Sequence, residues 1–384
     1  MTNNNPLLEI NNYGQSVWMD NLNRSLIESG ELEKQIENYG LKGITSNPAI
    51  FEKAIAGNKV YDADIEAGIK ADKPVSEIYE SLIFKDIRDT CDRFKEIYEQ
   101  TGGLDGYVSI EVSPHLARDT EGTVEEALRY YKAIDRENVM IKIPGTPEGF
   151  SAIERVIAEG VNVNVTLLFS IESYQEAAWA YIRGLETRVN QDKPIDKIAS
   201  VASFFLSRID TKIDDRIDEK LKNIGTETLN EEARLDKVQG KVAIANAKLA
   251  YQKFKEIINT DRWQALADKG ANIQRLLWAS TSTKNPKYSD VMYVNELVGE
   301  HTVNTLPPDT LEACADHCDI TANPVESNVE EAKQLIASLQ DPDINIDLNE
   351  VMEELLEEGI DKFIKPFDSL QQTLEDKVKQ LATA

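Results

Sequence analysis

The chain has 384 residues, of which 42 are Lys or Arg and 68 are Asp or Glu, so its formal net charge at pH 7 is −26. A protein this acidic repels nucleic acid and anionic lipid on average, which argues against both as partners. No stretch approaches the ~18 uncharged apolar residues of a membrane-spanning helix, and the N-terminus lacks the basic and apolar regions of a signal peptide. These features predict a cytoplasmic protein that does not act at a membrane.

The cysteine content excludes a disulfide-rich scaffold. The three cysteines, Cys91, Cys314 and Cys318, are too few for a disulfide framework and fit a reducing compartment. Cys314 and Cys318 flank His317, but three possible ligands without a fourth partner make a weak metal site. We therefore expect this segment to pack as an ordinary helix and predict no metal, with a regulatory thiol role as the alternative.

Eight short apolar or alternating runs recur along the chain and are separated by helical patterns. The runs cover residues 16–22, 41–48, 106–114, 139–146, 161–169, 198–208, 275–283 and 302–310. The helical patterns between them cover residues 22–39, 75–100, 123–135, 149–158, 170–188 and 289–298. Two longer helical insertions are expected at about 49–105 and 209–270, and a C-terminal helical segment at about 325–384. Within that segment, residues 349–359 and 361–374 have the pattern of amphipathic helices that pack on the rest of the protein.

Strands that alternate with helices are typical of parallel βαβ units, and eight such units close a (β/α)₈ barrel. A doubly wound open sheet is the alternative. The barrel is favoured because nearly every run ends in a polar residue, and in a barrel these strand ends meet at one mouth. The sequence thus predicts a single TIM-barrel domain over residues 1–384. Its strand-end residues are Asp20, Asn47, Glu111, Lys142, Thr166, Ser203, Ser280 and Thr305.

In the fifth run, Asn162, Asn164 and Thr166 alternate with valines and a leucine. A strand places these polar side chains on one face and the apolar ones on the other. The outer face of a barrel packs against helices and should be apolar, so the polar face should be the interior. The polar groups then either bind a ligand or form a self-satisfied internal network.

Lys142 interrupts the apolar run VMIKIPGT, and Glu111 occupies a similar place in VSIEVSP. A buried ammonium is costly unless it is paired or neutralised. One interpretation is a buried salt bridge that stabilises the barrel. The other is a nucleophilic amine that attacks a carbonyl, assisted by a carboxylate that shuttles the protons of imine formation.

Several motifs of this chain resemble those of the transaldolase family, in particular its longer bacterial-type branch without an attached isomerase domain. The resemblance covers most of residues 10–312. It rests on GITSNPAIF (43–51), VSIEV (108–112), IKIPGT (141–146), NVTLLFS (164–170), SFFLSRID (203–210) and LVGEHTVNTLPPDTL (297–311).

The resemblance implies a class I, Schiff-base aldolase of the pentose phosphate pathway that needs no cofactor. Such an enzyme transfers a dihydroxyacetone unit between sedoheptulose 7-phosphate and glyceraldehyde 3-phosphate on one side and erythrose 4-phosphate and fructose 6-phosphate on the other. The expected partners are therefore small sugar phosphates, and the expected assembly is a monomer or a homodimer.

The same resemblance implies a role for each matching residue. Lys142 would form the Schiff base, and Glu111 would act as acid and base through a water held by Thr166. Asp20 would take the proton from the C4 hydroxyl as the C3–C4 bond breaks, and return it in the reverse step. The implied substrate contacts are Thr45, Asn47, Asn164, Ser203 and, for the phosphate, Arg208.

One departure concerns the phosphate. Many transaldolases have a second phosphate-binding arginine soon after the seventh strand, whereas this chain offers Lys284, displaced by two positions. A lysine binds phosphate as a point charge and not as a bidentate fork. The alternatives are a solvated loop lysine for Lys284 and a salt bridge with Asp210 or Asp214 for Arg208.

Two other functions are compatible with the same residues. The smaller fructose-6-phosphate aldolases typically have glutamine and tyrosine where this chain has Glu111 and Phe205, so Phe205 at the substrate favours transfer over simple cleavage. A non-catalytic sugar-phosphate-binding barrel is the third possibility, and it would require Lys142 to be an ordinary paired charge.

Overall fold

A computed structural model of the chain describes residues 5–223 and 229–382. At its centre, eight parallel strands follow one another in chain order and close into a barrel, because the last strand also pairs with the first. The predicted (β/α)₈ fold is therefore confirmed, with one strand in each predicted run. The strands are β1 Gln15–Asp20, β2 Gly43–Thr45, β3 Tyr107–Glu111, β4 Val139–Pro144, β5 Val163–Leu168, β6 Ser200–Phe205, β7 Arg275–Ala279 and β8 Thr302–Leu306.

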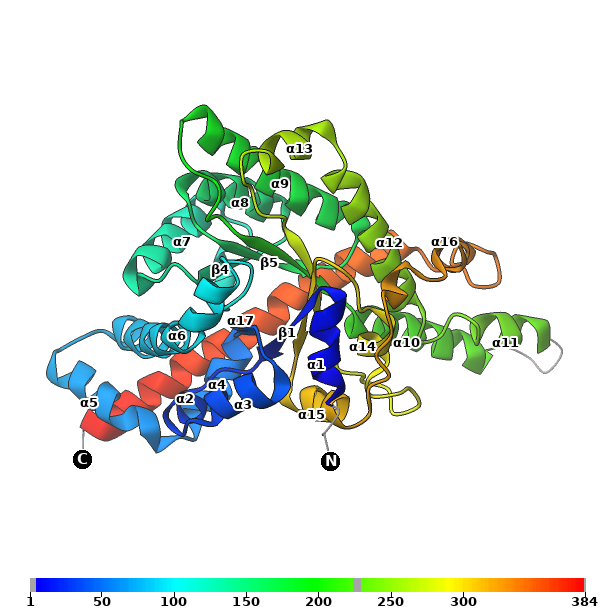
Figure 1. Ribbon diagram of the computed structural model, residues 1–384. Helices are drawn as coiled ribbons and strands as arrows, with labels where there is room; N and C mark the ends of the chain where they lie inside the picture. The colour runs from blue at the N-terminus through cyan, green and yellow to red at the C-terminus, as the bar shows by residue number, and fades with distance from the viewer. Residues whose placement is uncertain (1–4, 224–228, 383–384) are drawn as a thin grey trace.

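Helices surround this barrel, so its strands are buried on both faces and can be apolar throughout. Figure 1 shows α7, α8 and α9 together on one side, while α12 lies next to α9. The helices are α1 Pro6–Ile10, α2 Arg24–Glu28, α3 Glu31–Tyr39, α4 Pro48–Ala56, α5 Asp62–Lys70, α6 Val75–Gln100, α7 Thr120–Ile134, α8 Pro147–Glu159, α9 Ile171–Asn190, α10 Ser207–Asn223, α11 Leu229–Leu235, α12 Val242–Ile258, α13 Asp261–Ala267, α14 Met292–Glu296, α15 Pro308–His317, α16 Val329–Ser338 and α17 Leu348–Ala382.

The predicted helix over residues 22–39 is in fact two short helices, α2 and α3. They are separated at Gly30, whose φ of 73° is a left-handed conformation that glycine adopts without strain. The first predicted insertion contains α4, α5 and α6. The second contains α10 to α13 and includes residues 224–228, which lie outside the described part of the chain.

The two helices predicted at 349–359 and 361–374 form one 35-residue helix, α17, which continues through Pro366. A proline within a helix removes one backbone hydrogen bond. The apolar face of α17 continues on both sides of Pro366, through Ile360, Phe363, Leu370 and Leu374, all of which are buried. Packing of this face offsets the missing bond. In Figure 1, α17 runs diagonally along the molecule from the α10 side to α5.

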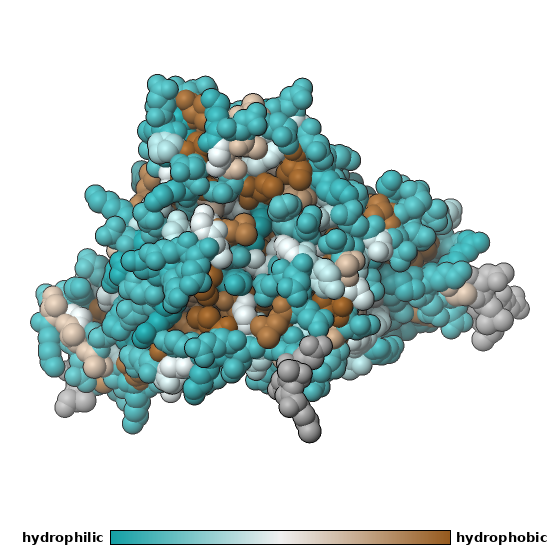
Figure 2. Space-filling view, viewed as in Figure 1, coloured by the Kyte–Doolittle hydropathy of each residue, from teal (hydrophilic) through white to brown (hydrophobic). Residues whose placement is uncertain are grey.

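No helix in the described ranges combines the length and apolar character that a membrane crossing requires. Figure 2 shows that hydrophilic residues dominate the visible face and that apolar residues are scattered over it. Among the residues whose exposure the structure describes, the large apolar side chains exposed to solvent are Leu8 and Leu104.

Candidate active site

A cavity of about 750 Å³ opens at the carboxyl ends of the barrel strands. It brings together eleven of the residues that the sequence singled out: Asp20, Thr45, Asn47, Lys142, Thr166, Ser203, Phe205, Arg208, Ser280, Lys284 and Thr305. The remaining lining residues are Ala279, Ser282, Pro307 and Phe363. Because β4, β5, β6, β7 and β8 all contribute, the cavity is the mouth of the barrel, where catalytic sites of this fold are found.

Lys142 projects from β4 into this cavity, next to Glu111, its direct partner in β3. Their charged atoms, Nζ and Oε2, are 3.7 Å apart, and the two side chains are 7% and 4% exposed. Nζ donates a hydrogen bond to the backbone carbonyl of Ser46 at 3.0 Å. The lysine is therefore held by one carbonyl and one carboxylate, with its amine turned toward the cavity.

Burial raises the pKa of Glu111 to about 7, while the charge of Lys142 opposes the rise and that of Asp20 adds to it. A carboxyl group with this pKa can both donate and accept a proton near neutral pH. In the described residues, Glu111 Oε2 and the buried hydroxyl of Thr166 have no hydrogen-bond partner. Both oxygens are thus available to a water molecule or a substrate hydroxyl.

Asp20, at the end of β1, is held by its neighbours in β2 and β8. The Thr45 hydroxyl donates to Asp20 Oδ1 at 2.7 Å and is 2.8 Å from the Thr305 hydroxyl. Burial raises the pKa of Asp20, and the nearby charge of Lys142 opposes the rise. This chain of hydroxyl groups fixes the direction of the carboxylate without neutralising it.

The polar residues of the fifth run differ in whether their side chains are bonded within the barrel or line the cavity. Asn162 lies before β5, and its side chain bonds to backbone groups of Glu137, Val139 and Ala199, so the self-satisfied network is correct for this residue. Asn164 is also internally satisfied, since Nδ2 donates to Ser109 Oγ at 3.1 Å and Oδ1 accepts from Ser203 Oγ at 2.6 Å. It does not line the cavity, unlike Thr166.

Asn47 has one of its two amide ends committed. Its Oδ1 accepts a hydrogen bond from the backbone N–H of Ile50 at 3.1 Å and thereby caps the N-terminus of α4. The amide NH₂ group is then left to donate to a ligand in the cavity.

Arg208 and Lys284 make one part of the cavity cationic. Arg208 is in the first turn of α10, and its guanidinium lies 5.1 Å from the centroid of the Phe205 ring. Nη1 is buried without a hydrogen-bond partner in the described ranges. Burial lowers the pKa of Lys284, and the positive charge of Arg208 lowers it further. Two cations that line the same cavity form a favourable environment for a phosphate group.

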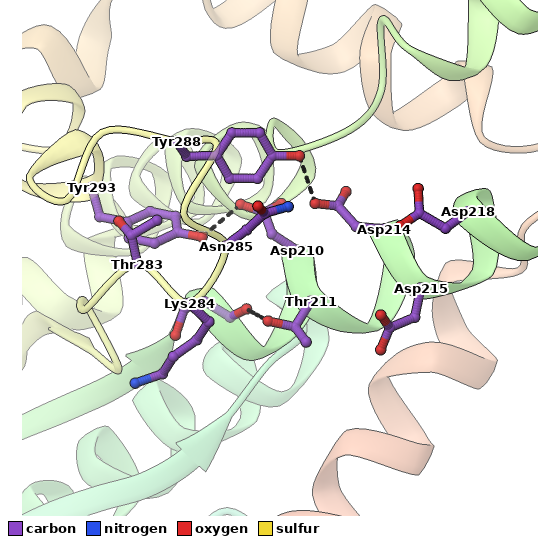
Figure 3. A pocket seen from close by; sticks show the side chains of 11 residues that line it. Asp210, Thr211, Asp214, Asp215, Asp218, Thr283, Lys284, Asn285, Tyr288 and Tyr293 are labelled. Atoms are coloured by element: carbon purple, nitrogen blue, oxygen red, sulfur yellow. Dashed lines mark hydrogen bonds between the residues drawn. The ribbon is translucent and has the colours of Figure 1, made fainter.

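The alternative salt bridges of Arg208 are wrong, because Asp210 and Asp214 bind elsewhere. Tyr293 donates to Asp210 at 2.8 Å and Tyr288 donates to Asp214 at 2.7 Å. These two bonds, drawn in Figure 3, tie the segment that carries Lys284 to helix α10. The four residues that form these bonds line a second cavity of about 560 Å³. Lys284 lines both this cavity and the first.

The sequence reasoning missed Phe363, Ser282 and Pro307 as lining residues. Phe363 belongs to the apolar face of α17, and no local pattern indicates which part of that face lies over the cavity. Its ring centroid is 5.8 Å from Lys142 Nζ.

No group of three His, Cys, Asp or Glu side chains in the described part of the chain is arranged to hold a metal. The three cysteines are free and buried. His317, the other candidate ligand, is 2.9 Å from Asp290.

The chain belongs to the transaldolase/fructose-6-phosphate aldolase family, whose sequence model matches residues 17–374. It is 68% identical to a transaldolase of Trichodesmium erythraeum, over 98% of both chains. It is 63% identical to transaldolase 2 of Nostoc punctiforme, over 98% of this chain and 99% of the relative. A transaldolase of Saccharopolyspora erythraea is 46% identical over 99% of this chain and 100% of its own.

Proposed function

We propose that this protein is a transaldolase that transfers a dihydroxyacetone unit from a ketose phosphate to an aldose phosphate through a Schiff base. The observation that carries the proposal is the buried pair of Lys142 and Glu111, 3.7 Å apart, of which Lys142 lines the cavity at the barrel mouth and Glu111 lies behind it without lining the cavity. Full-length relatives named transaldolase support it. A structural salt bridge would not require the unpartnered polar atoms that surround this pair.

In the first step, the amine of Lys142 attacks the C2 carbonyl of the donor, and loss of water gives an imine. Glu111 exchanges the protons of this step with a water held by Thr166. Support comes from the unpartnered Glu111 Oε2 and Thr166 hydroxyl and from the raised pKa of Glu111. General acid–base catalysis of this kind typically accelerates a step by about 10²–10⁴-fold.

In the second step, Asp20 removes the proton from the C4 hydroxyl and the C3–C4 bond breaks. The electrons of that bond move into the protonated imine, which becomes an enamine, and the aldose phosphate leaves. An acceptor aldose phosphate then reacts in the reverse direction, with Asp20 returning the proton. The bond from Thr45 keeps Asp20 directed at the substrate.

Substrate binding is assigned to the remaining residues of the cavity. Arg208 and Lys284 bind the phosphate, and the free amide of Asn47 and the Ser203 hydroxyl bind donor hydroxyls. Asn164 does not line the cavity but orients the Ser203 hydroxyl, which donates to Asn164 Oδ1, while its Nδ2 donates to Ser109 Oγ. Phe205, next to Arg208, presents an apolar ring where related aldolases typically have a tyrosine.

Several expectations from the sequence stay predictions: a cytoplasmic location, no nucleic-acid partner, no cofactor and a monomer or homodimer. We also propose a single domain, because helices of both insertions, as well as α17, contact the barrel strands or the helices that surround them.

The test is a two-substrate assay without added cofactor. Fructose 6-phosphate and erythrose 4-phosphate should give sedoheptulose 7-phosphate and glyceraldehyde 3-phosphate in equal amounts. Free dihydroxyacetone as the main product would instead identify an aldolase. No turnover, with binding of the sugar phosphates retained, would favour the non-catalytic barrel.

A further inference from the structure

We propose that Phe363 of α17 determines the specificity of the reaction by shielding the Lys142 intermediate from bulk water, so that transfer prevails over release of free dihydroxyacetone. The inference rests on the proposed function, since it assigns a further residue to the same site. Phe363 lines the cavity although it comes from the last helix, far in sequence from every strand.

The position of the ring is well defined by its surroundings. Phe363 is 7% exposed, and its centroid is 5.8 Å from Lys142 Nζ. An aromatic ring at about this distance from a cation favours a positive charge on the nitrogen. The ring therefore suits a protonated imine at Lys142 while it occupies space that water would otherwise fill.

A glycine allows α17 to lie directly on the barrel mouth. Gly359 is one turn before Phe363, and a Cβ atom at this position would lie 2.8 Å from Leu167 Cδ2 and 3.6 Å from Arg208 Nη1. A contact as short as the first is not tolerated without movement of the neighbour. The absence of a side chain at Gly359 thus brings the helix, and Phe363 with it, against the end of β5.

Ion pairs fasten α17 on both sides of Phe363. Before it, Lys212 of α10 contacts Glu354 at 2.9 Å and Glu358 at 2.5 Å. After it, Lys377 contacts Asp62 of α5 at 2.6 Å. A helix fixed at two distant points holds its central side chain in one place, which is what a water shield requires.

The enamine on Lys142 is the branch point between transfer and release. In transfer, its nucleophilic carbon forms a bond to the carbonyl carbon of the acceptor. In release, the same carbon takes a proton from solvent, water adds to the resulting imine carbon, and the C–N bond breaks to give dihydroxyacetone and the free amine of Lys142. Restricting solvent at the enamine slows protonation and leaves addition to the acceptor unaffected.

The test compares two rates of the same full-length enzyme. Release of dihydroxyacetone is measured with fructose 6-phosphate alone, and transfer is measured at saturating erythrose 4-phosphate. Replacing the ring in Phe363→Ala should raise the ratio of release to transfer about tenfold, which is about 1.4 kcal/mol between the two barriers. Phe363→Leu keeps apolar bulk and should change the ratio by less than about threefold.

The ratio separates a shield from a merely structural residue. A partly unfolded variant loses both rates by the same factor, so its ratio stays constant. Met352→Ala, on the same helix but outside the cavity, is the matched control and should leave the ratio unchanged. If Phe363→Ala does not fold, Phe363→Val takes its place, and its ratio should lie between that of Phe363→Leu and the value expected for Phe363→Ala.

Borohydride trapping distinguishes failure of the proposed role of Phe363 from failure of the proposed function. An adduct on Lys142 together with an unchanged ratio in Phe363→Ala would overturn this inference and leave the proposed function standing. The absence of any adduct on Lys142 in the wild type would overturn both.

Discussion

Burial raises the pKa of Glu111 and of Asp210 to about 7, yet the two carboxyl groups have different surroundings. Glu111 Oε2 accepts no hydrogen bond from the described residues and lies 3.7 Å from Lys142 Nζ, whereas both oxygens of Asp210 accept hydrogen bonds, from Tyr293 and the backbone of Ala243. A carboxyl group with an oxygen free of hydrogen bonds is suited to proton transfer. A carboxyl group whose two oxygens both accept hydrogen bonds is suited to stabilising the fold. Each assignment has a test of its own.

Glu111→Gln should lower kcat about 10²–10⁴-fold, because glutamine has nearly the same shape but cannot exchange the protons of imine formation. The measurement is the steady-state rate of transfer from fructose 6-phosphate. Glu148→Gln, at the surface, is the control and should keep the wild-type rate. A loss smaller than about threefold in Glu111→Gln would exclude the acid–base role.

Asp210→Asn should make stability less dependent on pH. The pKa of Asp210 rises from its ordinary 3.8 to about 7 on folding, so the folded state binds more protons between these pH values. Stability therefore falls as pH rises through this window, by up to about 1.4 kcal/mol per pH unit for one group. Asparagine is always neutral, so urea unfolding from pH 4 to pH 7 should show a flatter profile. An identical slope in both proteins would contradict the assignment.

Among the elements, the eight strands were predictable because their apolar runs and polar ends are local features of the sequence. The limits of some helices were not. Gly30 divides one predicted helix, while two predicted helices join through Gly359 and Pro366 into α17, because packing over the barrel mouth outweighs local helix propensity. The same long-range packing explains why Phe363 escaped notice.

In the site, Lys142, Glu111 and Asp20 were predictable because charges within apolar strands stand out, and the family motifs assign them roles. The partners of these residues were not predictable. Lys142 bonds to a backbone carbonyl, that of Ser46, which no side-chain pattern reveals. Asn162 was expected among the strand residues, but β5 begins one residue later, and its amide closes a backbone network instead.

Tyr288→Phe tests whether the segment between β7 and α14 positions Lys284. The substitution removes only the hydroxyl that bonds Asp214, so the segment should loosen and the second phosphate contact should weaken. We expect KM for fructose 6-phosphate to rise about tenfold, equivalent to about 1.4 kcal/mol, with kcat little changed. Reaction with unphosphorylated fructose should not change.

The control for this element is Tyr251→Phe, which removes a similar bond, to the carbonyl of Glu300, away from the cavity. It should leave KM as in the wild type. Equal effects of Tyr288→Phe on fructose and on fructose 6-phosphate would show that the segment supports folding and not phosphate binding.

At the scale of the whole molecule, one end of the barrel carries a buried ion pair that stabilises the fold, and the other end carries the candidate active site. At the end opposite the cavity, Arg275 pairs with Asp105 at 2.9 Å, with both side chains 5% exposed. Arg275 and Asp105 also share the Ser16 hydroxyl, so β1, β7 and the start of β3 are joined. The charges of Asp20, Glu111 and Lys142 lie toward the other ends of their strands.

Asp105→Ala should lower the free energy of unfolding by about 3–5 kcal/mol, because it leaves the guanidinium of Arg275 buried without its counter-charge. Urea unfolding measures this loss, and KM for fructose 6-phosphate should remain as in the wild type. Glu137→Ala, which breaks an exposed pair with Lys197, should lower the free energy of unfolding by less than about 1 kcal/mol. A loss below about 1 kcal/mol in Asp105→Ala would show that the buried pair does not stabilise the barrel.

Chemical trapping tests directly whether Lys142 is the nucleophile. The protein is incubated with fructose 6-phosphate without acceptor, reduced with borohydride, digested and mapped by mass. If Lys142 is the nucleophile, it should carry a three-carbon dihydroxyacetone adduct, and Lys142→Ala should carry none. An unmodified Lys142, or adducts scattered over surface lysines, would contradict it and leave Lys142 as a structural charge.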